Sequence, residues 1–295
     1  MNIEKLIASL QNEILKTQTG IQQTQSLERL KSVAKSYNGE DKIVSFASFI
    51  EKVKANINKV KIFSGFSNLD SIIKGFRLKQ VVVVSGVTKH GKTTWVMDLT
   101  SKMIDQHPLW FPLEESAEEL IEKYIERGEE PPEMFTPLSY ASISLNWIES
   151  KIIESIAKNN TKVVVIDQLD FIVPQIGDNH HLRVAQTMRD LKDIAKRLDI
   201  VIFILCHLTK VKIDTQPTLE DLKGSSSIGG EADTVILVWR ETKRENGEVI
   251  ITNNTNISVQ ANRKGGTTGN IKMVFDNGHY HEQDWVSEHS NLANF

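Results

Sequence analysis

The sequence predicts an α/β protein with a mostly parallel central sheet flanked by helices, preceded by a short helical extension. From residue 62 onward, apolar runs of strand length alternate with stretches of helical periodicity, which is typical of a sheet covered on both faces. The chain has 295 residues and 40% hydrophobic content, enough to bury one large core. A glycine-bearing turn at 86–93 directly follows one apolar run, as in a strand–turn–helix unit.

The predicted core alternates β-branched strands with amphipathic helices. The expected strands are 81–85, 109–112, 162–167, 200–206, 234–239, 256–262 and 270–275. The expected helices are 92–106, 116–127, 145–158 and 182–198. Asn-Gly and Asn-Asn pairs within 241–254 predict an exposed hairpin or loop.

Upstream of the core, the sequence predicts helices separated by a linker. Apolar residues at helical spacing favour two short amphipathic helices within 1–36, and turn-forming residues at 36–41 indicate a linker. A further helix fits 46–60, with one apolar face and one lysine-rich face. We therefore expect an N-terminal extension, a linker helix, a core and a C-terminal tail, at residues 1–44, 45–61, 62–285 and 286–295.

Charge and composition restrict the class of protein. A formal net charge of −3 argues against a chain that coats nucleic acid over its whole surface, yet it permits a local basic channel. The sequence has no run of roughly 18 apolar residues and no signal-peptide layout at its N-terminus. Cys206 is the only cysteine, so an intramolecular disulfide is excluded. We expect a cytoplasmic protein without a membrane partner.

The turn after the strand at 81–85 has the complete GxxxxGK[ST] pattern of a phosphate-binding loop. Backbone N–H groups of such a turn converge on the β- and γ-phosphates of a nucleotide, and the dipole of the next helix adds positive potential. Lys92 is expected to bridge the phosphate oxygens, and Thr93 to hold Mg²⁺. The expected nucleotide-binding residues are Gly86, Val87, Thr88, Lys89, His90, Gly91, Lys92, Thr93 and Thr94.

A candidate magnesium carboxylate ends the apolar run at 162–167. Asp167 can reach the phosphate-binding loop, because ligands of open α/β sheets bind beyond the carboxyl ends of the strands. Asp170 is an alternative magnesium partner, although a hydrogen bond within the following loop explains it as well. The sequence thus predicts the second acidic position that γ-phosphate hydrolysis requires.

Groups that can act on water or on the γ-phosphate follow two other strands. Glu114 and Glu115 come after the strand at 109–112, and either could accept a proton from the attacking water. Glu115 can also be read as an acid that complements a helix dipole. His207 follows the strand at 200–206 and could contact the γ-phosphate, although a lone histidine in this position is more often structural.

A basic, glycine-rich turn at 262–269 can project Arg263 outward. In a ring of subunits, Arg263 would reach the γ-phosphate held by a neighbour and stabilise transition-state charge, as an arginine finger. A hairpin with ordinary surface cations explains the turn equally well. His180 and His181 have no carboxylate or cysteine at ligand spacing, so we assign them no metal.

Taken together, these residues resemble the RecA-like ATPase core of the DnaB family of ring-shaped replicative helicases, including its phage and Twinkle-type branch. The resemblance covers residues 45–285 and rests on several blocks in the family's order. The blocks are 64–70, 86–93, 111–114, 163–167, 205–208, 217–240 and 263–269.

The resemblance implies a motor that hydrolyses Mg-ATP, forms a homo-oligomer, expected to be a hexamer, and moves along single-stranded DNA to unwind forked duplex DNA. A primase or a loader protein would be a partner. It also implies that Glu114 is the catalytic glutamate, His207 the γ-phosphate sensor and Arg263 the finger. Ala261 stands where many members carry a lysine that assists the finger, so Lys264 would have to replace it. The N-terminal collar or primase of the family is too large for the residues upstream of 45.

In such a ring, DNA would pass through the centre and contact the loops at 173–183 and 210–227. Cationic side chains there could follow a phosphate backbone without reading sequence: Arg183, Lys210, Lys212 and Lys223. Two other activities fit the same core. One is a recombinase-like or annealing-accessory ATPase that forms filaments on DNA, and the other is a regulatory or remodelling ring ATPase.

Overall fold

The computed structural model describes Ala8, Asn12 and residues 20–39, 42–51, 54, 61–140, 143–174, 179–208, 215–222, 225–265 and 267–283. The chain divides into two compact units, residues 1–59 and 60–295. In the first unit, α2 (Gly20–Lys35) is a helix and η1 (Phe46–Phe49) is a 3₁₀ turn with an exposed Phe46. Most of the first predicted helix, and most of residues 52–60 of the predicted linker helix, lie outside the described residues.

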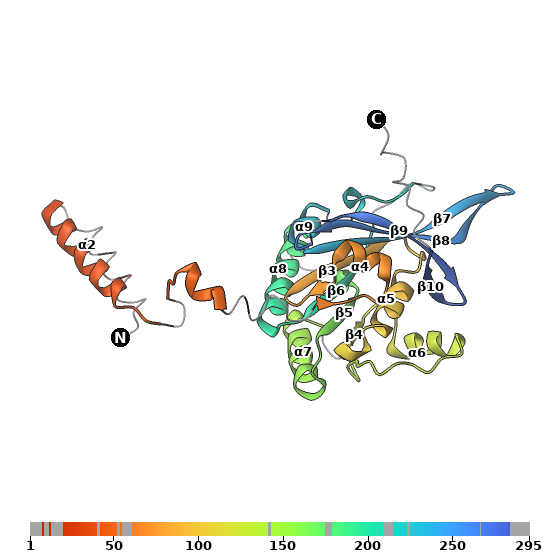
Figure 1. Cartoon of the computed structure of the whole chain (residues 1–295), viewed down its shortest axis with the longest axis horizontal. Helices are drawn as coiled ribbons and strands as arrows, with labels where there is room; N and C mark the ends of the chain where they lie inside the picture. Colours follow the sequence, from red (N-terminus) through yellow and green to blue (C-terminus); the bar gives the residue numbers. More distant parts are fainter. Residues whose placement is uncertain are drawn as a thin grey trace. The chain divides into compact units, whose positions relative to one another are not determined.

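The second unit is a three-layer α/β structure (Figure 1). Its strands are β1 (Lys61–Ile62), β2 (Phe76–Arg77), β3 (Gln80–Gly86), β4 (Leu109–Pro112), β5 (Val163–Asp167), β6 (Val201–His207), β7 (Thr234–Glu245), β8 (Glu248–Asn262), β9 (Gly269–Asp276) and β10 (His279–Glu282). Its helices are α4 (Ser67–Ile73), α5 (Lys92–Ser101), α6 (Ala117–Glu126), α7 (Leu145–Asn159), α8 (His180–Leu198) and α9 (Ser225–Glu231), with short 3₁₀ turns η2 (Ile104–Gln106), η3 (Leu169–Phe171) and η4 (Leu219–Asp221).

The large sheet has the strand order β10-β9-β8-β7-β3-β6-β5-β4. Strands β7, β3, β6, β5 and β4 are parallel, whereas β8, β9 and β10 add an antiparallel extension beside β7. The carboxyl ends of β3, β6, β5 and β4 therefore line one edge of the sheet in that order. Functional side chains that follow these strands are brought together there, as the sequence predicts.

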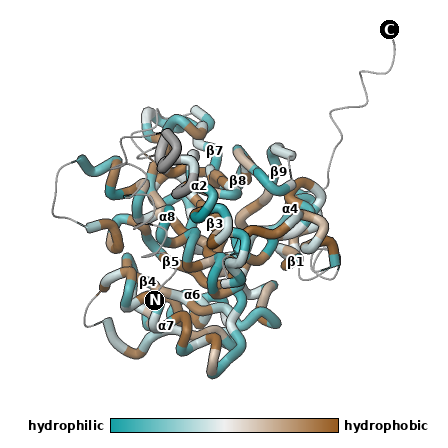
Figure 2. The backbone as a smooth tube through the Cα atoms, turned by 90° about the vertical axis from the view of Figure 1, so that its left-hand side faces the viewer, coloured by the Kyte–Doolittle hydropathy of each residue, from teal (hydrophilic) through white to brown (hydrophobic). Residues whose placement is uncertain are grey.

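Alternating side chains of the central strands build two hydrophobic layers. On β3, Val82 and Val84 pack with α4, α5 and α6, while Val81 and Val83 pack with α7, α8 and α9. Burial on both faces explains why the parallel strands read as continuous apolar runs. The flanking helices carry both polar and apolar residues along their length, as expected of elements that bury one side only (Figure 2).

Several helix boundaries differ from the sequence prediction for local reasons. The helix predicted at 92–106 ends at Ser101 and is followed by a 3₁₀ turn, because the chain must reverse before Pro108 and β4. α8 begins at His180 and not at residue 182. His180 and His181 therefore lie in its first turn and not in the predicted loop. α9 was not predicted, and its first residues overlap the end of the predicted DNA-contacting loop.

Short α4 was also absent from the sequence prediction. The carboxylate of Glu282 on β10 accepts hydrogen bonds from the backbone N–H groups of Asn68 (2.7 Å) and Leu69 (3.3 Å) at its N-terminus. The first N–H groups of a helix are usually capped by a side chain just before it. Here the capping side chain comes from more than two hundred residues away in the sequence. α4 therefore depends on the C-terminal strand, which residue spacing near 67–73 cannot reveal.

The C-terminal half contains two hairpins with Asn-Gly turns. β7 extends beyond its predicted end at residue 239, and β8 begins before its predicted start at residue 256. The two strands join at Asn246-Gly247, so the hairpin alternative for 241–254 is confirmed. β9 and the unpredicted β10 join at Asn277-Gly278. Both turns have positive φ at both residues, which favours asparagine and glycine. Among the described residues, no helix is long and apolar enough to cross a membrane.

Candidate nucleotide-binding site

The phosphate-binding loop connects β3 to α5 at the carboxyl edge of the sheet. Gly91 has a φ of +83°, a conformation that L side chains rarely adopt. At Gly86, a Cβ would lie 2.1 Å from the carbonyl oxygen of Val238 on the neighbouring strand. Two of the pattern's fixed positions therefore require glycine, one for backbone conformation and one for close packing. Lys92 and Thr93 occupy the first turn of α5, as predicted.

Lys92 lies close to the predicted γ-phosphate sensor and glutamate. Its Nζ is 3.4 Å from Nδ1 of His207, and the other ring nitrogen, Nε2, is 3.5 Å from Oε1 of Glu114. An ammonium group can only donate, so Nδ1 accepts and Nε2 carries the proton that faces the glutamate. Burial lowers the pKa of Lys92, an effect that Asp167 and Glu114 oppose. The positive charge of Lys92 in this position favours the binding of a polyphosphate.

The two candidate glutamates have different surroundings. Glu114 is solvent-exposed, and its backbone N–H donates to the carbonyl of Asp167 at 2.9 Å, which fixes it beside the end of β5. Glu115 instead forms an ion pair with Lys123 of α6. Of the two alternatives left open by the sequence, the geometry brings Glu114 to the His207 side of the site and turns Glu115 toward α6.

Asp167 and Thr93 form a site with the chemistry of a magnesium ligand pair. The Thr93 hydroxyl donates to Oδ2 of Asp167 at 2.8 Å. Oδ1 of Asp167 is buried and has no hydrogen-bond partner among the residues that the structure describes. A buried carboxylate oxygen without a donor is costly unless a cation or water satisfies it, and oxygen ligands are those Mg²⁺ prefers. These two residues therefore fit a magnesium ion.

Burial makes the ionised form of Asp167 unfavourable for folding in the metal-free protein. It raises the pKa of Asp167 to about 6, and Glu114 adds to the rise, while Thr93 and Lys92 oppose it. Because the folded-state pKa is above the ordinary value of 3.8, ionisation above pH 6 destabilises the fold. The penalty amounts to about 3 kcal/mol at neutral pH, given about 1.4 kcal/mol per pKa unit. It declines as the pH falls through 6 and is gone near pH 4.

We therefore expect Asp167→Asn to stabilise the metal-free protein. At pH 7.5 with a chelator present, urea unfolding should give a free energy of unfolding about 1–2 kcal/mol above wild type, and the gain should vanish near pH 4. Asp170→Asn is the matched control, since Asp170 is only partly buried, and it should change stability by less than about 0.5 kcal/mol. A destabilised Asp167→Asn protein at pH 7.5 would contradict this expectation.

Arg263 lies at the opposite end of the sheet from the loop of its own chain. Its backbone N–H donates to the carbonyl of Asp233 at 2.8 Å, and the N–H of Asp233 donates to Val81 at the start of β3. Its exposed guanidinium contacts the carbonyls of Gly229 and Gly230. The loop begins at Gly86, five residues or about 16 Å along β3. Arg263 is therefore remote from the Lys92 of the same chain.

Arg183 is the one predicted DNA-contacting cation that lies within the described residues. Arg183 lies in the first turns of α8. Lys210, Lys212 and Lys223 lie outside the described residues, as do 175–178 and 209–214. Among the described residues, no group of three or more His, Cys, Asp or Glu side chains could hold a metal ion.

The structure adds an aromatic–cation pair that sequence reasoning missed. The guanidinium of Arg240 lies over the ring of Phe275, 4.6 Å from its centre. The backbone N–H of Arg240 donates to Nδ1 of His90 at 3.2 Å. Burial and the Arg240 charge lower the pKa of His90, so this nitrogen is available to accept. Because the pair comes from β7 and β9, residues far apart in sequence, spacing alone could not reveal it.

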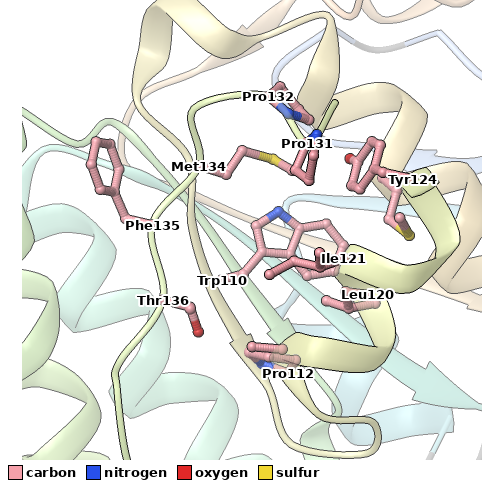
Figure 3. Close-up of a pocket in the computed structure, with 12 residues that line it drawn as sticks. Trp110, Pro112, Leu120, Ile121, Tyr124, Pro131, Pro132, Met134, Phe135 and Thr136 are labelled. Carbon is pink, nitrogen blue, oxygen red and sulfur yellow. The ribbon is translucent and has the colours of Figure 1, made fainter. Parts of the chain in front are cut away.

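A polar cavity of about 510 Å³ adjoins the loop beside this pair. Its walls come from the first turn of α5, the end of α6, β9 and the β9–β10 turn: Thr94, Lys123, Glu126, Arg127, Phe275, Asn277 and Gly278. A separate apolar pocket of about 120 Å³ lies between β4, α6 and 131–136, where Trp110 lies between Met134 and Leu120 (Figure 3). None of the predicted catalytic or phosphate-binding residues lines that second pocket.

Comparison with known proteins identifies the family of this chain. The model of the DnaB-like helicase C-terminal domain matches residues 61–130 and 138–283, which include every element of the site. This chain belongs to the DnaB-like helicase C-terminal domain family. Curated relatives include a probable replicative DNA helicase from Trieres chinensis, 25% identical over 72% of this chain and 55% of the relative. The replicative DNA helicase DnaB of Haemophilus influenzae is 25% identical over 81% of this chain and 58% of the relative.

Two solved structures share the fold of this DnaB-like domain. One is an isolated ATPase domain, which superposes with a TM-score of 0.65 at 22% identity and covers 81% of this chain and 96% of the other. The other is a DnaB-like replicative helicase, described together with its interactions with primase. It superposes with a TM-score of 0.68 at 20% identity, and the match covers 95% of this chain and 77% of the other. The RecA-like fold expected from the sequence is confirmed. The chain spans little more than half the length of the curated relatives it matches.

Proposed function

We propose that this chain is the motor of a replicative DNA helicase, which hydrolyses ATP and moves along single-stranded DNA as a ring of identical subunits. The observation that carries the proposal is the convergence of Lys92, Asp167, His207 and Glu114 at one sheet edge, in a chain of the DnaB-like family. Each group belongs to a different strand end, as phosphoanhydride hydrolysis at an open α/β sheet requires.

In the proposed reaction, Lys92 and the N–H groups of the loop hold the triphosphate, and Glu114 accepts a proton from the attacking water. Glu114 is exposed to solvent, which lets water reach it, and His207 lies between it and Lys92. Phosphate and carboxylate oxygens only accept, so a His207 that carries a proton on each ring nitrogen would donate to a bound γ-phosphate from one nitrogen and to Glu114 from the other. Thr93 and Asp167 would hold Mg²⁺, which neutralises charge on the phosphates.

The position of Arg263 supports an assembly in which each site is shared by two subunits. A guanidinium at the far end of the sheet cannot contact the γ-phosphate bound by its own chain, but a head-to-tail arrangement would bring it to the next one. Such heterologous contacts close into rings when the rotation between subunits allows it. We propose a hexamer. Forked duplex DNA is the proposed substrate, and a primase or loader protein a proposed partner.

We propose ATP as the nucleotide and the cavity beside Thr94 as the place of its base. Phe275, whose ring also contacts Arg240, lines this cavity, and stacking on an aromatic ring tolerates any base. Asn277 and Gly278 also line the cavity, and they would contribute polar contacts to the base. The base would thus bind between elements that also position the loop.

A forked-duplex unwinding assay with ATP and Mg²⁺, on the full chain and on Lys92→Ala, tests the proposal. We expect strand separation by wild type, none by Lys92→Ala, and a closed ring of subunits by electron microscopy. ATP hydrolysis on DNA-bound helical filaments would favour a recombinase-like ATPase instead. Hydrolysis that DNA does not stimulate, without strand separation, would favour a remodelling ATPase.

A further inference from the structure

The β9–β10 hairpin places a tyrosine hydroxyl against the backbone of the phosphate-binding loop. Tyr280 is buried on β10, and its hydroxyl oxygen lies 3.4 Å from the carbonyl oxygen of His90 and 3.2 Å from that of Gly91. Carbonyl oxygens only accept, so the phenol is the donor in both contacts. Burial raises the pKa of Tyr280, so the hydroxyl keeps its proton at neutral pH.

Tyr280 is itself fixed to the helix that carries Lys92. Its backbone N–H donates to Oδ2 of Asp98 on α5 at 2.7 Å. Asp98 also forms a buried ion pair with Arg127 at 2.8 Å, which joins the ends of α5 and α6. The ring of Tyr280 packs against Phe275 with centroids 5.0 Å apart. The hydroxyl is thus held on a rigid support and not on a freely rotating side chain.

The direction of these carbonyl groups matters for phosphate binding. In a trans peptide unit, the C=O and the N–H point in opposite directions. The unit that carries the carbonyl of His90 carries the N–H of Gly91, and the next unit pairs the carbonyl of Gly91 with the N–H of Lys92. The Gly91 carbonyl also accepts from the backbone N–H of Trp95 at 2.9 Å, so the first turn of α5 helps to hold it, whereas Tyr280 adds a contact to both carbonyls. A donor that holds both carbonyls on the Tyr280 side directs both N–H groups away from Tyr280. Phosphate oxygens are bound by such converging N–H groups.

We propose that Tyr280 is a positioning residue for nucleotide binding, whose hydroxyl orients the two peptide units at the end of the phosphate-binding loop before the nucleotide arrives. A Cβ at Gly91 would lie 2.0 Å from the same hydroxyl oxygen, so the glycine also leaves room for this contact. The inference rests on the proposed function, because it requires that the loop binds a triphosphate. It adds to the predicted nucleotide-binding residues one that lies outside the loop, on strand β10, which the sequence did not predict.

Tyr280→Phe tests the proposal, because it removes the hydroxyl and keeps the ring against Phe275. We expect affinity for ATP, measured by titration with a fluorescent ATP analogue and by competition with ATP, to fall about three- to tenfold. In steady-state hydrolysis, KM should rise by about the same factor, while kcat at saturating ATP stays within about twofold. A change confined to stability, with affinity and KM unaltered, would overturn the proposal.

Tyr124→Phe is the matched control. Tyr124 is also buried, and its hydroxyl makes a hydrogen bond with the Ser101 hydroxyl at 3.0 Å. That bond lies within the α5–α6 contact and not at the loop. Its ATP affinity should stay within about twofold of wild type. Equal losses in both variants would overturn the proposal, because general loosening would then explain them. A wild-type chain that binds no ATP would refute the proposed function itself.

Discussion

Glu114→Gln is expected to lower kcat for ATP hydrolysis by about 10²–10⁴ while ATP affinity stays within about threefold. Glutamine keeps the size of the side chain and can still accept from Nε2 of His207, but it cannot take a proton from water. The phosphate-holding residues are untouched, so binding should survive. Phosphate release under multiple turnover gives kcat, and titration with a fluorescent ATP analogue gives the affinity.

Glu115→Gln is the control that the sequence itself provides. Glu115 follows the same strand, yet it pairs with Lys123 on α6 and not with His207. Losing an ion pair that is about one-third exposed should alter stability by at most about 1 kcal/mol and kcat by less than about threefold. If Glu115→Gln lost as much activity as Glu114→Gln, the assignment of the water-activating carboxylate would be wrong.

Arg263→Ala is expected to lower kcat by about 10³ in the assembled protein and to leave ATP affinity nearly unchanged. The guanidinium lies far from the loop of its own chain and is exposed, so its loss removes little from the fold. The substitution instead removes the positive charge that would stabilise the transition state at the γ-phosphate bound by the neighbouring subunit. Hydrolysis with single-stranded DNA present, together with light scattering to confirm the same oligomer, measures the effect.

Arg197→Ala provides the comparison for that variant. Arg197 is a partly exposed arginine at the end of α8 that pairs with Glu149 and Asp193 of its own chain. Because surface pairs of this kind contribute little, kcat should remain within about twofold of wild type. Full hydrolysis by assembled Arg263→Ala would contradict a trans-acting role for the basic turn and favour its reading as a hairpin with surface cations.

The central sheet and the edge where the groups converge could be predicted from the sequence because both depend on local patterns. Continuous β-branched runs mark strands buried on both faces, and each candidate group directly follows one of them. The choice between Glu114 and Glu115 could not be predicted, because neighbours in sequence differ only in the partners the fold gives them. His207 and Lys123, which separate the two, come from β6 and α6.

Elements completed by distant residues were also missed. α4 depends on the carboxylate of Glu282, and the Arg240–Phe275 pair joins two strands of the antiparallel extension. β10 did leave a signal, since Asn277-Gly278 after a predicted strand is a strong hairpin turn. Its short, polar sequence gives no clear alternation, and only the fold shows that Tyr280 faces inward toward the loop.

Subunit mixing tests most directly whether each catalytic centre is built from two chains. Lys92→Ala and Arg263→Ala subunits carrying different tags are co-expressed, and assemblies that contain both are isolated on both tags in turn. Each variant alone should be inactive, whereas random mixing should restore hydrolysis to about a quarter of the wild-type rate, from sites that join an intact loop to an intact finger. Mixed assemblies as inactive as either parent would contradict the shared site.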